Sequence, residues 1–131
     1  MSDRQIPLPD RPPTTRVLAM PRDTNAAGDI FGGWIMSQVD IAASIAAHRR
    51  ARGRVVTVAV NEFQFHEPVF VGDLISCYTE IIRVGTTSLT VHVEVFAERD
   101  RGAEECIRVT EANLTFVAVD EQRRKRTVPG D

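Results

Sequence analysis

The chain has 131 residues, of which 43% are hydrophobic and 26% are charged. This composition is typical of one globular domain that is long enough to bury a core. The formal net charge of −2 excludes a nucleic-acid-binding protein that relies on overall basicity, although it leaves room for a local basic patch.

The cysteines and the N-terminus indicate a compartment. The sequence holds two cysteines, Cys77 and Cys106, and neither has the spacing of a metal site or a CxxC motif. We therefore expect reduced thiols in a cytoplasmic protein. Residues 1–7 lack the basic and apolar run of a signal peptide, and polar side chains interrupt the most apolar segment. We expect neither a membrane nor a nucleic acid as partner.

The N-terminal half predicts an arm, a strand and a helix. Four prolines predict an irregular arm over residues 1–13. A short first strand is expected over 14–20 and a loop over 21–31. A helix of roughly 27 Å is predicted over 32–50, and Gly53 is placed to end it.

The rest of the chain predicts strands. Segments rich in β-branched and aromatic residues lie at 55–65, 74–84, 88–98 and 106–119. In the third of them, apolar residues alternate with polar ones, which is the period-two pattern of a half-buried strand. Residues 121–131 are polar and basic, and we expect them to fray.

These elements predict an α+β fold with one domain over residues 14–120. Consecutive strands with short connections favour a curved antiparallel sheet that wraps around the long central helix. The helix is expected to bury an apolar stripe made of Ile35, Met36, Val39, Ala43 and Ala46. The outer sheet face, with Thr90, His92, Glu94 and Phe96, is a candidate for contacts between subunits.

Asp40 is the one ionisable residue between Phe31 and Ala47. Burial of a lone carboxylate is costly unless it is paired or hydrogen-bonded, so such a residue is a candidate for function. On a helical wheel it shares a small, polar flank with Gly33, Ser37 and Ser44.

The N-terminus of the same helix supplies a second candidate functional group, its free backbone amides. Free backbone N–H groups at Gly32 and Gly33, assisted by the helix dipole, can stabilise an oxyanion. A carboxylate farther along the helix can activate water or attack a carbonyl itself. These parts fit acyl transfer to water without a metal or a cysteine nucleophile.

Four segments carry a resemblance to a known family. They read LAMPRDTNAAGDIFGGWIMSQVD at 18–40, GRVVTV at 53–58, PVFVGD at 68–73 and GTTS at 85–88. In this order they closely resemble the YciA-type acyl-CoA thioesterases of the hot-dog superfamily. The resemblance implies hydrolysis of acyl-CoA to a free acid and coenzyme A, with no further cofactor and no metal.

The resemblance also implies roles for individual residues. The family's catalytic acid falls on Asp40. The asparagine that reaches across the dimer interface in related proteins falls on Asp29, which departs from them. The role therefore stays open between Asp29 and Asn25. The family's contact with coenzyme A falls on the turn Gly85, Thr86, Thr87 and Ser88. The strand opposite the helix, with Asn61, Glu62 and Phe63, is expected to line the acyl or pantetheine tunnel.

The resemblance further implies a homodimer with shared active sites, and a hexamer built as a trimer of dimers. Two other functions remain open: a hot-dog hydratase, which the lack of a histidine before Ala47 disfavours, and a non-catalytic acyl-CoA-binding protein.

Several prominent residues also have an ordinary structural interpretation. Asn25 and Asp29 can cap a turn, and the glycines can simply allow tight backbone geometry. The three histidines lack the spacing of a metal site or a triad. The basic residues at 49–54 and 123–126 are expected to be solvated, although one of them can contact the phosphates of coenzyme A.

Overall fold

A computed structural model describes residues 6–99 and 105–130 of the chain. The elements follow in the order β1 (Thr15–Leu18), a 3-10 helix (Pro21–Asp23), α1 (Gly32–Ala51), β2 (Val55–Phe65), β3 (Leu74–Val84), β4 (Ser88–Arg99) and β5 (Glu105–Ala118). The predicted strands and helix are confirmed within two residues at each end. The short 3-10 helix is an addition inside the segment that was predicted as loop. Within the described ranges, no helix is long and apolar enough to cross a membrane.

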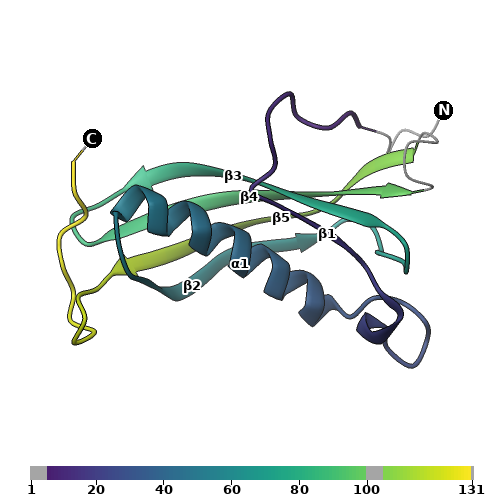
Figure 1. The fold of residues 1–131 in the computed structure, drawn as a ribbon, viewed down its shortest axis with the longest axis horizontal. Helices are drawn as coiled ribbons and strands as arrows, with labels where there is room; N and C mark the ends of the chain where they lie inside the picture. The colour runs from purple at the N-terminus through teal and green to yellow at the C-terminus, as the bar shows by residue number, and fades with distance from the viewer. Residues whose placement is uncertain (1–5, 100–104, 131) are drawn as a thin grey trace.

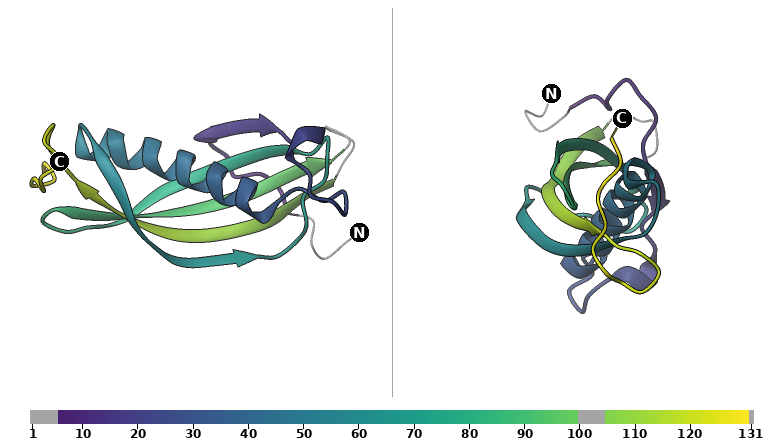
Figure 2. Two further views of the ribbon diagram at one scale, coloured as in Figure 1. Left: turned by 90° about the horizontal axis from the view of Figure 1, so that it is seen from below. Right: turned by 90° about the vertical axis from the view of Figure 1, so that its left-hand side faces the viewer.

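The five strands form one sheet in the order β1-β3-β4-β5-β2, and every neighbouring pair is antiparallel. Helix α1 lies along one face of this sheet and contacts four of the strands (Figure 1). Viewed along its length, the sheet curls around the helix (Figure 2). The predicted α+β architecture, with a curved antiparallel sheet wrapped around a long helix, is therefore confirmed.

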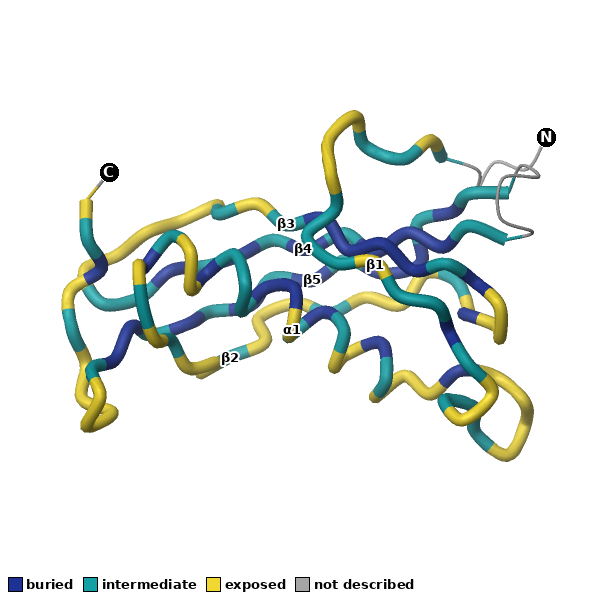
Figure 3. Tube along the Cα trace, viewed as in Figure 1, coloured by how far each residue is buried: buried dark blue, intermediate teal, exposed yellow. Residues whose placement is uncertain are grey.

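The core lies between α1 and the concave face of the sheet. The inward residues of β4, namely Leu89, Val91, Val93 and Val95, are fully buried, as their alternation predicted. Figure 3 shows the burial concentrated in the central strands and on one side of the helix, while β2 is largely exposed.

The buried stripe of α1 differs from the prediction at one position. Ile35, Val39 and Ala43 are buried and Ala46 is partly buried against the core, but Met36 is 44% exposed. The stripe continues instead through Ala42, Ala47 and Ala51. Small alanines bring the helix close to the sheet, and Met36 projects toward the exposed strand β2, so its inclusion in the stripe was wrong.

The outer sheet face is covered at Phe96, one of the four residues that we expected to be available for contacts between subunits. Phe96 is only 3% exposed and makes an edge-on contact with Tyr78, at 5.6 Å between ring centroids. The N-terminal arm crosses this surface: the guanidinium of Arg11 lies 5.4 Å from the centre of the Tyr78 ring and donates a hydrogen bond to the Thr79 carbonyl. Phe96 is therefore not available for contacts between subunits.

The C-terminal segment packs against the domain rather than fraying. Val128 is buried, and its N–H donates to the carbonyl of Thr86 in the β3–β4 turn. Arg126 donates hydrogen bonds to the carbonyls of Ala51, Arg54 and Val119. One side chain thereby holds the C-terminal end of α1, the start of β2 and the end of the sheet together, which the polar composition of the segment did not indicate.

Candidate active site

Asp40 lies in the third turn of α1 and faces the edge strand β2. Its Oδ1 accepts a hydrogen bond of 2.8 Å from the hydroxyl of Thr57. The two side chains border a pocket of about 270 Å³ that has an otherwise mostly apolar lining. The lining consists of Met36, Ser37, Asp40, Thr57, Val60, Phe63 and Leu114. The carboxylate is therefore held by one oxygen at the wall of an apolar pocket.

Thr57 is a site residue that the sequence analysis missed. Position 57 is the one polar residue in the run from Val55 to Val60. The sequence did offer one signal for Thr57, because it is a hydroxyl residue on a strand segment whose other side chains are aliphatic. Its partner lies 17 positions earlier, so no local spacing pattern connects the two.

Two bulges in β2 determine which residues face the pocket. The pairing of β2 with β5 skips Val58, between Thr57 and Ala59, and skips Asn61, between Val60 and Glu62. Each bulge adds one unpaired residue, which shifts the alternation of faces. Thr57, Val60 and Phe63 consequently all line the pocket, at a spacing of three instead of two.

The bulges also separate two predicted tunnel residues. Phe63 lines the pocket. Asn61 does not: its side-chain amide donates a 2.6 Å hydrogen bond to the hydroxyl of Thr115. Thr115 alternates with the buried residues Leu114 and Phe116 of β5 and belongs to the opposite face of the sheet.

The N-terminus of α1 presents two glycine amides. Phe31 is the N-cap, and its carbonyl accepts hydrogen bonds from the N–H groups of Trp34 and Ile35. Among the described residues, the N–H groups of Gly32 and Gly33 have no acceptor. This is the donor arrangement that the sequence indicated.

Within one chain, these amides are remote from Asp40. Eight residues separate Gly32 from Asp40, which corresponds to about 12 Å along the helix axis. Gly32 lies instead against Phe65 at the far end of β2, where a Cβ on Gly32 would be 3.5 Å from the ring. The structure of one chain does not bring the predicted acid and the predicted amides together.

The loop before the helix is organised by Asn25. Its side-chain oxygen accepts hydrogen bonds from the N–H groups of Ala27 and Asp29, at 2.9 and 3.1 Å. Its own N–H donates to the Asp29 carbonyl at 2.7 Å. Gly28, at φ +90°, permits this tight turn. Asn25 and Asp29 are both solvent-accessible, so the loop can present polar groups to a second chain.

The turn Gly85, Thr86, Thr87 and Ser88 lies at the other end of the molecule. Gly85 donates to the Ser88 carbonyl, and the Thr86 and Thr87 carbonyls accept from Val128 and Ala118. The turn is thus tied to the C-terminal segment, near the end of α1 (Figure 1).

A second pocket extends the groove between α1 and β2 beyond Asp40. It has a volume of about 440 Å³ and is lined by Ser44, Ile45, His48, Arg49, Arg54 and Val55. Ser44 lies one helical turn after Asp40, so the two pockets follow the same groove. Arg49 and Arg54 place positive charge on an apolar floor. Among the basic residues at 49–54, these two line a cavity.

One cysteine and two of the histidines have structural surroundings. Burial raises the pKa of the Cys77 thiol to about 11, which keeps it protonated and unreactive at neutral pH. His66 pairs with Glu111 at 3.0 Å and His92 with Asn113 at 2.7 Å. In the part of the chain that the structure describes, no three His, Cys, Asp or Glu side chains gather as a metal site requires.

The surface around the Asp40 pocket is apolar and unpaired. β2 is an edge strand of the sheet. Several exposed hydrophobic residues lie on this strand and on the helix beside it: Met36, Val56, Val58, Val60 and Phe65. An open strand edge with such side chains is typical of a surface covered by another chain.

A long helix wrapped by a five-stranded antiparallel sheet, with a carboxylate facing the edge strand, defines a hot-dog protein. Residues 27–104 match the thioesterase superfamily, and the chain belongs to this family. The expectation of a hot-dog thioesterase is therefore confirmed.

Several relatives of this chain are named for their activity. The acyl-CoA thioester hydrolase YciA of Escherichia coli is 47% identical over 116 residues, which cover 87% of this chain and 88% of YciA. A hexameric hot-dog thioesterase of Campylobacter jejuni is 47% identical, with a TM-score of 0.86 and coverage of 91% of both chains. A hexameric broad-specificity acyl-coenzyme A thioesterase, solved with one aspartate replaced by alanine, is 48% identical, with a TM-score of 0.87 and coverage of 91% of this chain and 87% of that chain.

A more distant relative is the acyl-CoA hydrolase of Staphylococcus aureus. Its structures include one variant with an asparagine replaced by alanine and one with a threonine replaced by alanine. Both variants are 28% identical to this chain and cover 88% of it, with TM-scores of 0.82 and 0.80. The present chain covers 69% and 71% of them.

Proposed function

We propose that this protein hydrolyses acyl-CoA thioesters to a free acid and coenzyme A, with Asp40 as the residue that activates water or attacks the thioester. The observation that carries the proposal is the Asp40–Thr57 pair at the wall of an apolar pocket. Relatives that are named acyl-CoA thioester hydrolases or thioesterases, at 47 to 48% identity, support the substrate class.

The active site is completed by a second copy of the chain. In one protomer, Asp40 bonds to Thr57, and Gly32 lies against Phe65. Positions 57 and 65 are equally far from Asn61. Antiparallel pairing of β2 with the partner's β2 around Asn61 therefore brings Thr57 opposite the partner's Phe65. The same operation brings Asp40 near the partner subunit's Gly32 and its free amides.

The same pairing of the two β2 strands also covers the exposed edge and the exposed apolar side chains. The open edge of β2 gains hydrogen bonds, and the apolar side chains on β2 and α1 are covered. Because the active site requires two chains, the dimer is the smallest active unit. We propose a hexamer of three such dimers, a state that the thioesterases of known structure described above support.

Asn25 is the polar residue that crosses the interface. The asparagine and the threonine replaced in the Staphylococcus aureus variants are separated by the same number of residues as Asn25 and Thr57. This spacing favours Asn25 over Asp29 for the role that the sequence left open. The side-chain oxygen of Asn25 is occupied by loop amides, which leaves its NH₂ group to contact the substrate or the attacking water.

The chemistry follows from these placements. The amides of Gly32 and Gly33 stabilise the charge that develops on the thioester oxygen. Thr57 holds one oxygen of Asp40 and leaves the other toward the pocket. Asp40 then either removes a proton from water as water attacks the carbonyl, or attacks the carbonyl itself to form an anhydride that water opens. Coenzyme A leaves as the thiolate in both cases and takes up the proton that the reacting water releases.

The two pockets of the groove between α1 and β2 indicate how coenzyme A is oriented in the site. Arg49 and Arg54 lie in the pocket next to the Asp40 pocket, and guanidinium groups suit phosphate oxygens. We place the phosphates near these two residues and retain the turn at 85–88 as a second candidate contact. The pocket bordered by Phe63, Val60 and Leu114 suits an apolar chain or the pantetheine arm.

The proposal is tested with Asp40→Asn, which preserves shape and removes the base. A free-thiol assay with acyl-CoA is expected to show turnover reduced by at least about 100-fold. Wild-type turnover would overturn the mechanism. A single turnover in ¹⁸O-water tests the anhydride route: label in Asp40 requires an anhydride opened at the Asp40 carbonyl, whereas direct attack by water places all of the label in the released acid.

A further inference from the structure

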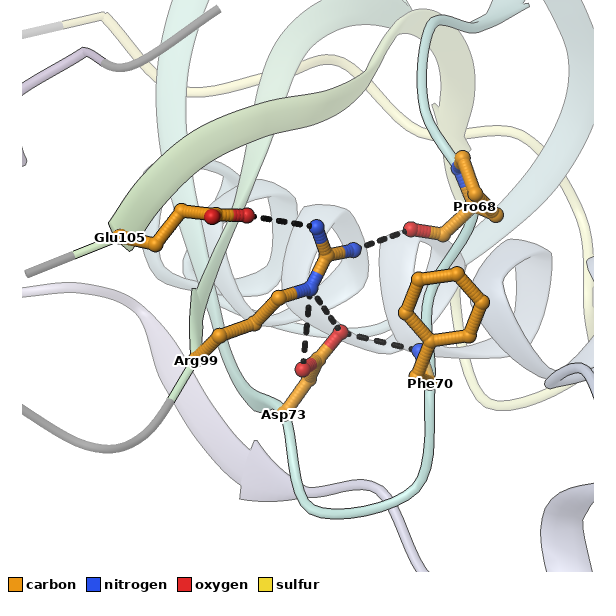
Figure 4. Close-up of polar contacts among 5 residues, drawn as sticks. All are labelled: Pro68, Phe70, Asp73, Arg99 and Glu105. Atoms are coloured by element: carbon orange, nitrogen blue, oxygen red, sulfur yellow. Dashed lines mark hydrogen bonds and ion pairs between the residues drawn. The ribbon is translucent and has the colours of Figure 1, made fainter. Parts of the chain in front are cut away.

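A partly buried ion pair lies at the end of the molecule that carries the start of α1. Arg99, the last residue of β4, directs its Nε toward both carboxylate oxygens of Asp73 at 3.2 Å. Asp73 is only 3% exposed. Arg99 Nη1 donates to Glu105 at 3.0 Å, and Nη2 donates to the Pro68 carbonyl at 2.6 Å. Figure 4 shows the guanidinium at the centre of these contacts.

The same guanidinium also fixes the segment between β2 and β3, residues 66–73, which contains no helix or strand. Its carbon lies 4.7 Å from the centre of the Phe70 ring. The Phe70 N–H donates to Asp73 Oδ2 at 2.9 Å (Figure 4). Arg99 thus touches the beginning, the middle and the end of the turn from Pro68 to Asp73.

The turn from Pro68 to Asp73 is hydrogen-bonded to both ends of the loop that leads into α1. At one end, the Ala19 N–H donates a hydrogen bond to the Asp73 carbonyl at 3.0 Å. The Ala19 carbonyl accepts one from the Gly72 N–H at 2.9 Å. At the other end, the Ile30 N–H donates to the Val69 carbonyl at 3.1 Å. Ile30 and Val69 are both buried, so the contact is shielded from water.

Ile30 is followed by the N-cap Phe31 and then by Gly32 and Gly33. The turn also forms one wall of a pocket of about 290 Å³ beside Gly32, which is lined by Ile30, Gly32, Ile35, Phe65, His66, Glu67, Pro68 and Val69. Any displacement of Pro68 or Val69 therefore changes both the direction of the two amides and the space in front of them.

We propose that Arg99 is a positioning residue for the reaction, which sets the Gly32 and Gly33 amides through the turn from Pro68 to Asp73 and its hydrogen bond to Ile30. The inference rests on the proposed function of these amides. An oxyanion site stabilises a transition state only when its donors are held in the productive geometry. One side chain with five N–H donors and a buried carboxylate partner supplies that rigidity.

Arg126 offers a matched control. Arg126 is an arginine as well. Its guanidinium donates three hydrogen bonds, all of them to backbone carbonyls, and it lies at the C-terminal end of α1. Loss of either side chain removes the hydrogen bonds of a whole guanidinium, and loss of Arg99 also leaves the buried Asp73 carboxylate without its cation. Only the loss of Arg99 is expected to affect the start of the helix.

The test compares Arg99→Ala with Arg126→Ala in the full chain, at a temperature where both are folded. Amide hydrogen exchange at Ile30 is expected to rise about tenfold or more in Arg99→Ala, relative to Val93 in the core, and to stay unchanged in Arg126→Ala. In acyl-CoA hydrolysis, kcat of Arg99→Ala is expected to fall about tenfold or more with a smaller change in KM. Arg126→Ala is expected to keep wild-type kcat, and its contact with the Arg54 carbonyl confines any effect to KM.

Arg99→Lys provides a second variant if Arg99→Ala does not fold. A lysine keeps the charge opposite Asp73 but lacks the fork that also reaches Pro68 and Glu105. Exchange at Ile30 and kcat are expected to lie between those of wild type and Arg99→Ala. Unchanged exchange at Ile30, or equal losses in Arg126→Ala, would overturn the inference. The exchange measurement does not depend on turnover, so it distinguishes this failure from a wild-type rate in Asp40→Asn, which would overturn the proposed function.

Discussion

The hydroxyl of Thr57 donates a 2.8 Å hydrogen bond to Oδ1 of Asp40, and it joins the edge strand β2 to the middle of α1. The contact fixes one oxygen of the carboxylate and leaves the second for the substrate or water. A carboxylate on a helix is otherwise free to change rotamer. Thr57 therefore controls the direction of the proposed catalytic group without itself reacting.

Replacement of Thr57 tests this relationship. Thr57→Val keeps the shape and removes the donor, and kcat for acyl-CoA hydrolysis is expected to fall by about 10- to 100-fold, the range of one hydrogen bond to a charged group. Thr57→Ser retains the hydroxyl and is expected to recover most of the rate. Equal kcat in the valine variant and wild type would show that the bond has no role in turnover.

The part of the fold that depends on local patterning was predictable from sequence. The alternation in β4 and the uncharged run in α1 each specify an element within a few consecutive residues. The bulges at Val58 and Asn61 were not predictable, because one extra residue in a strand leaves no local signal. They decide that Val60 faces the pocket and that Asn61 does not.

Contacts between residues far apart in the chain were the second feature that the sequence did not predict. Asp40 was identified because it is unusual in its own helix, whereas Thr57, Arg99 and Arg126 act through partners far away in the chain. Arg126 lies in a segment whose composition indicates fraying. Its three carbonyl contacts appear only when the end of α1 and the start of β2 are brought together by folding.

The two arginines of the second pocket are expected to act on binding. Arg49→Glu combined with Arg54→Glu should raise KM for acyl-CoA about tenfold or more, because two attractions to phosphate become repulsions. The KM for an acyl-N-acetylcysteamine thioester, which has no phosphates, should change little. Lys125→Glu, an exposed charge reversal in the C-terminal segment, is the control. Equal effects on both substrates would contradict the placement of the phosphates.

Assembly through β2 is tested at Val58, which is 54% exposed in one chain. Val58→Asp places a charge in the proposed interface, where burial of an unpaired carboxylate is costly. Light scattering is expected to show smaller species, with loss of thioesterase activity. Val58→Thr, of similar shape, should still assemble. A Val58→Asp variant that keeps the mass of the wild-type oligomer would exclude this surface as the interface.

The buried thiol of Cys77 predicts a loss of stability at alkaline pH. Its pKa is about 11 in the folded chain, against an ordinary value of 9.0, so the unfolded chain releases this proton first. The contribution is complete below pH 9 and is lost as the pH rises from 9 to 11, to a total of about 2 to 3 kcal/mol. Urea unfolding of Cys77→Ala should show a smaller decrease over this range than wild type. The same decrease in both would show that Cys77 does not cause it.

The central claim is that each active site combines Asp40 of one chain with Asn25 and the glycine amides of another. The most direct measurement mixes Asp40→Asn and Asn25→Ala, each nearly inactive alone, after dissociation and reassembly at equal concentrations. Half of the dimers are then mixed, and each holds one site with both native residues. About a quarter of wild-type activity is expected from this symmetry. Activity no greater than the average of the two parent variants would contradict the shared site.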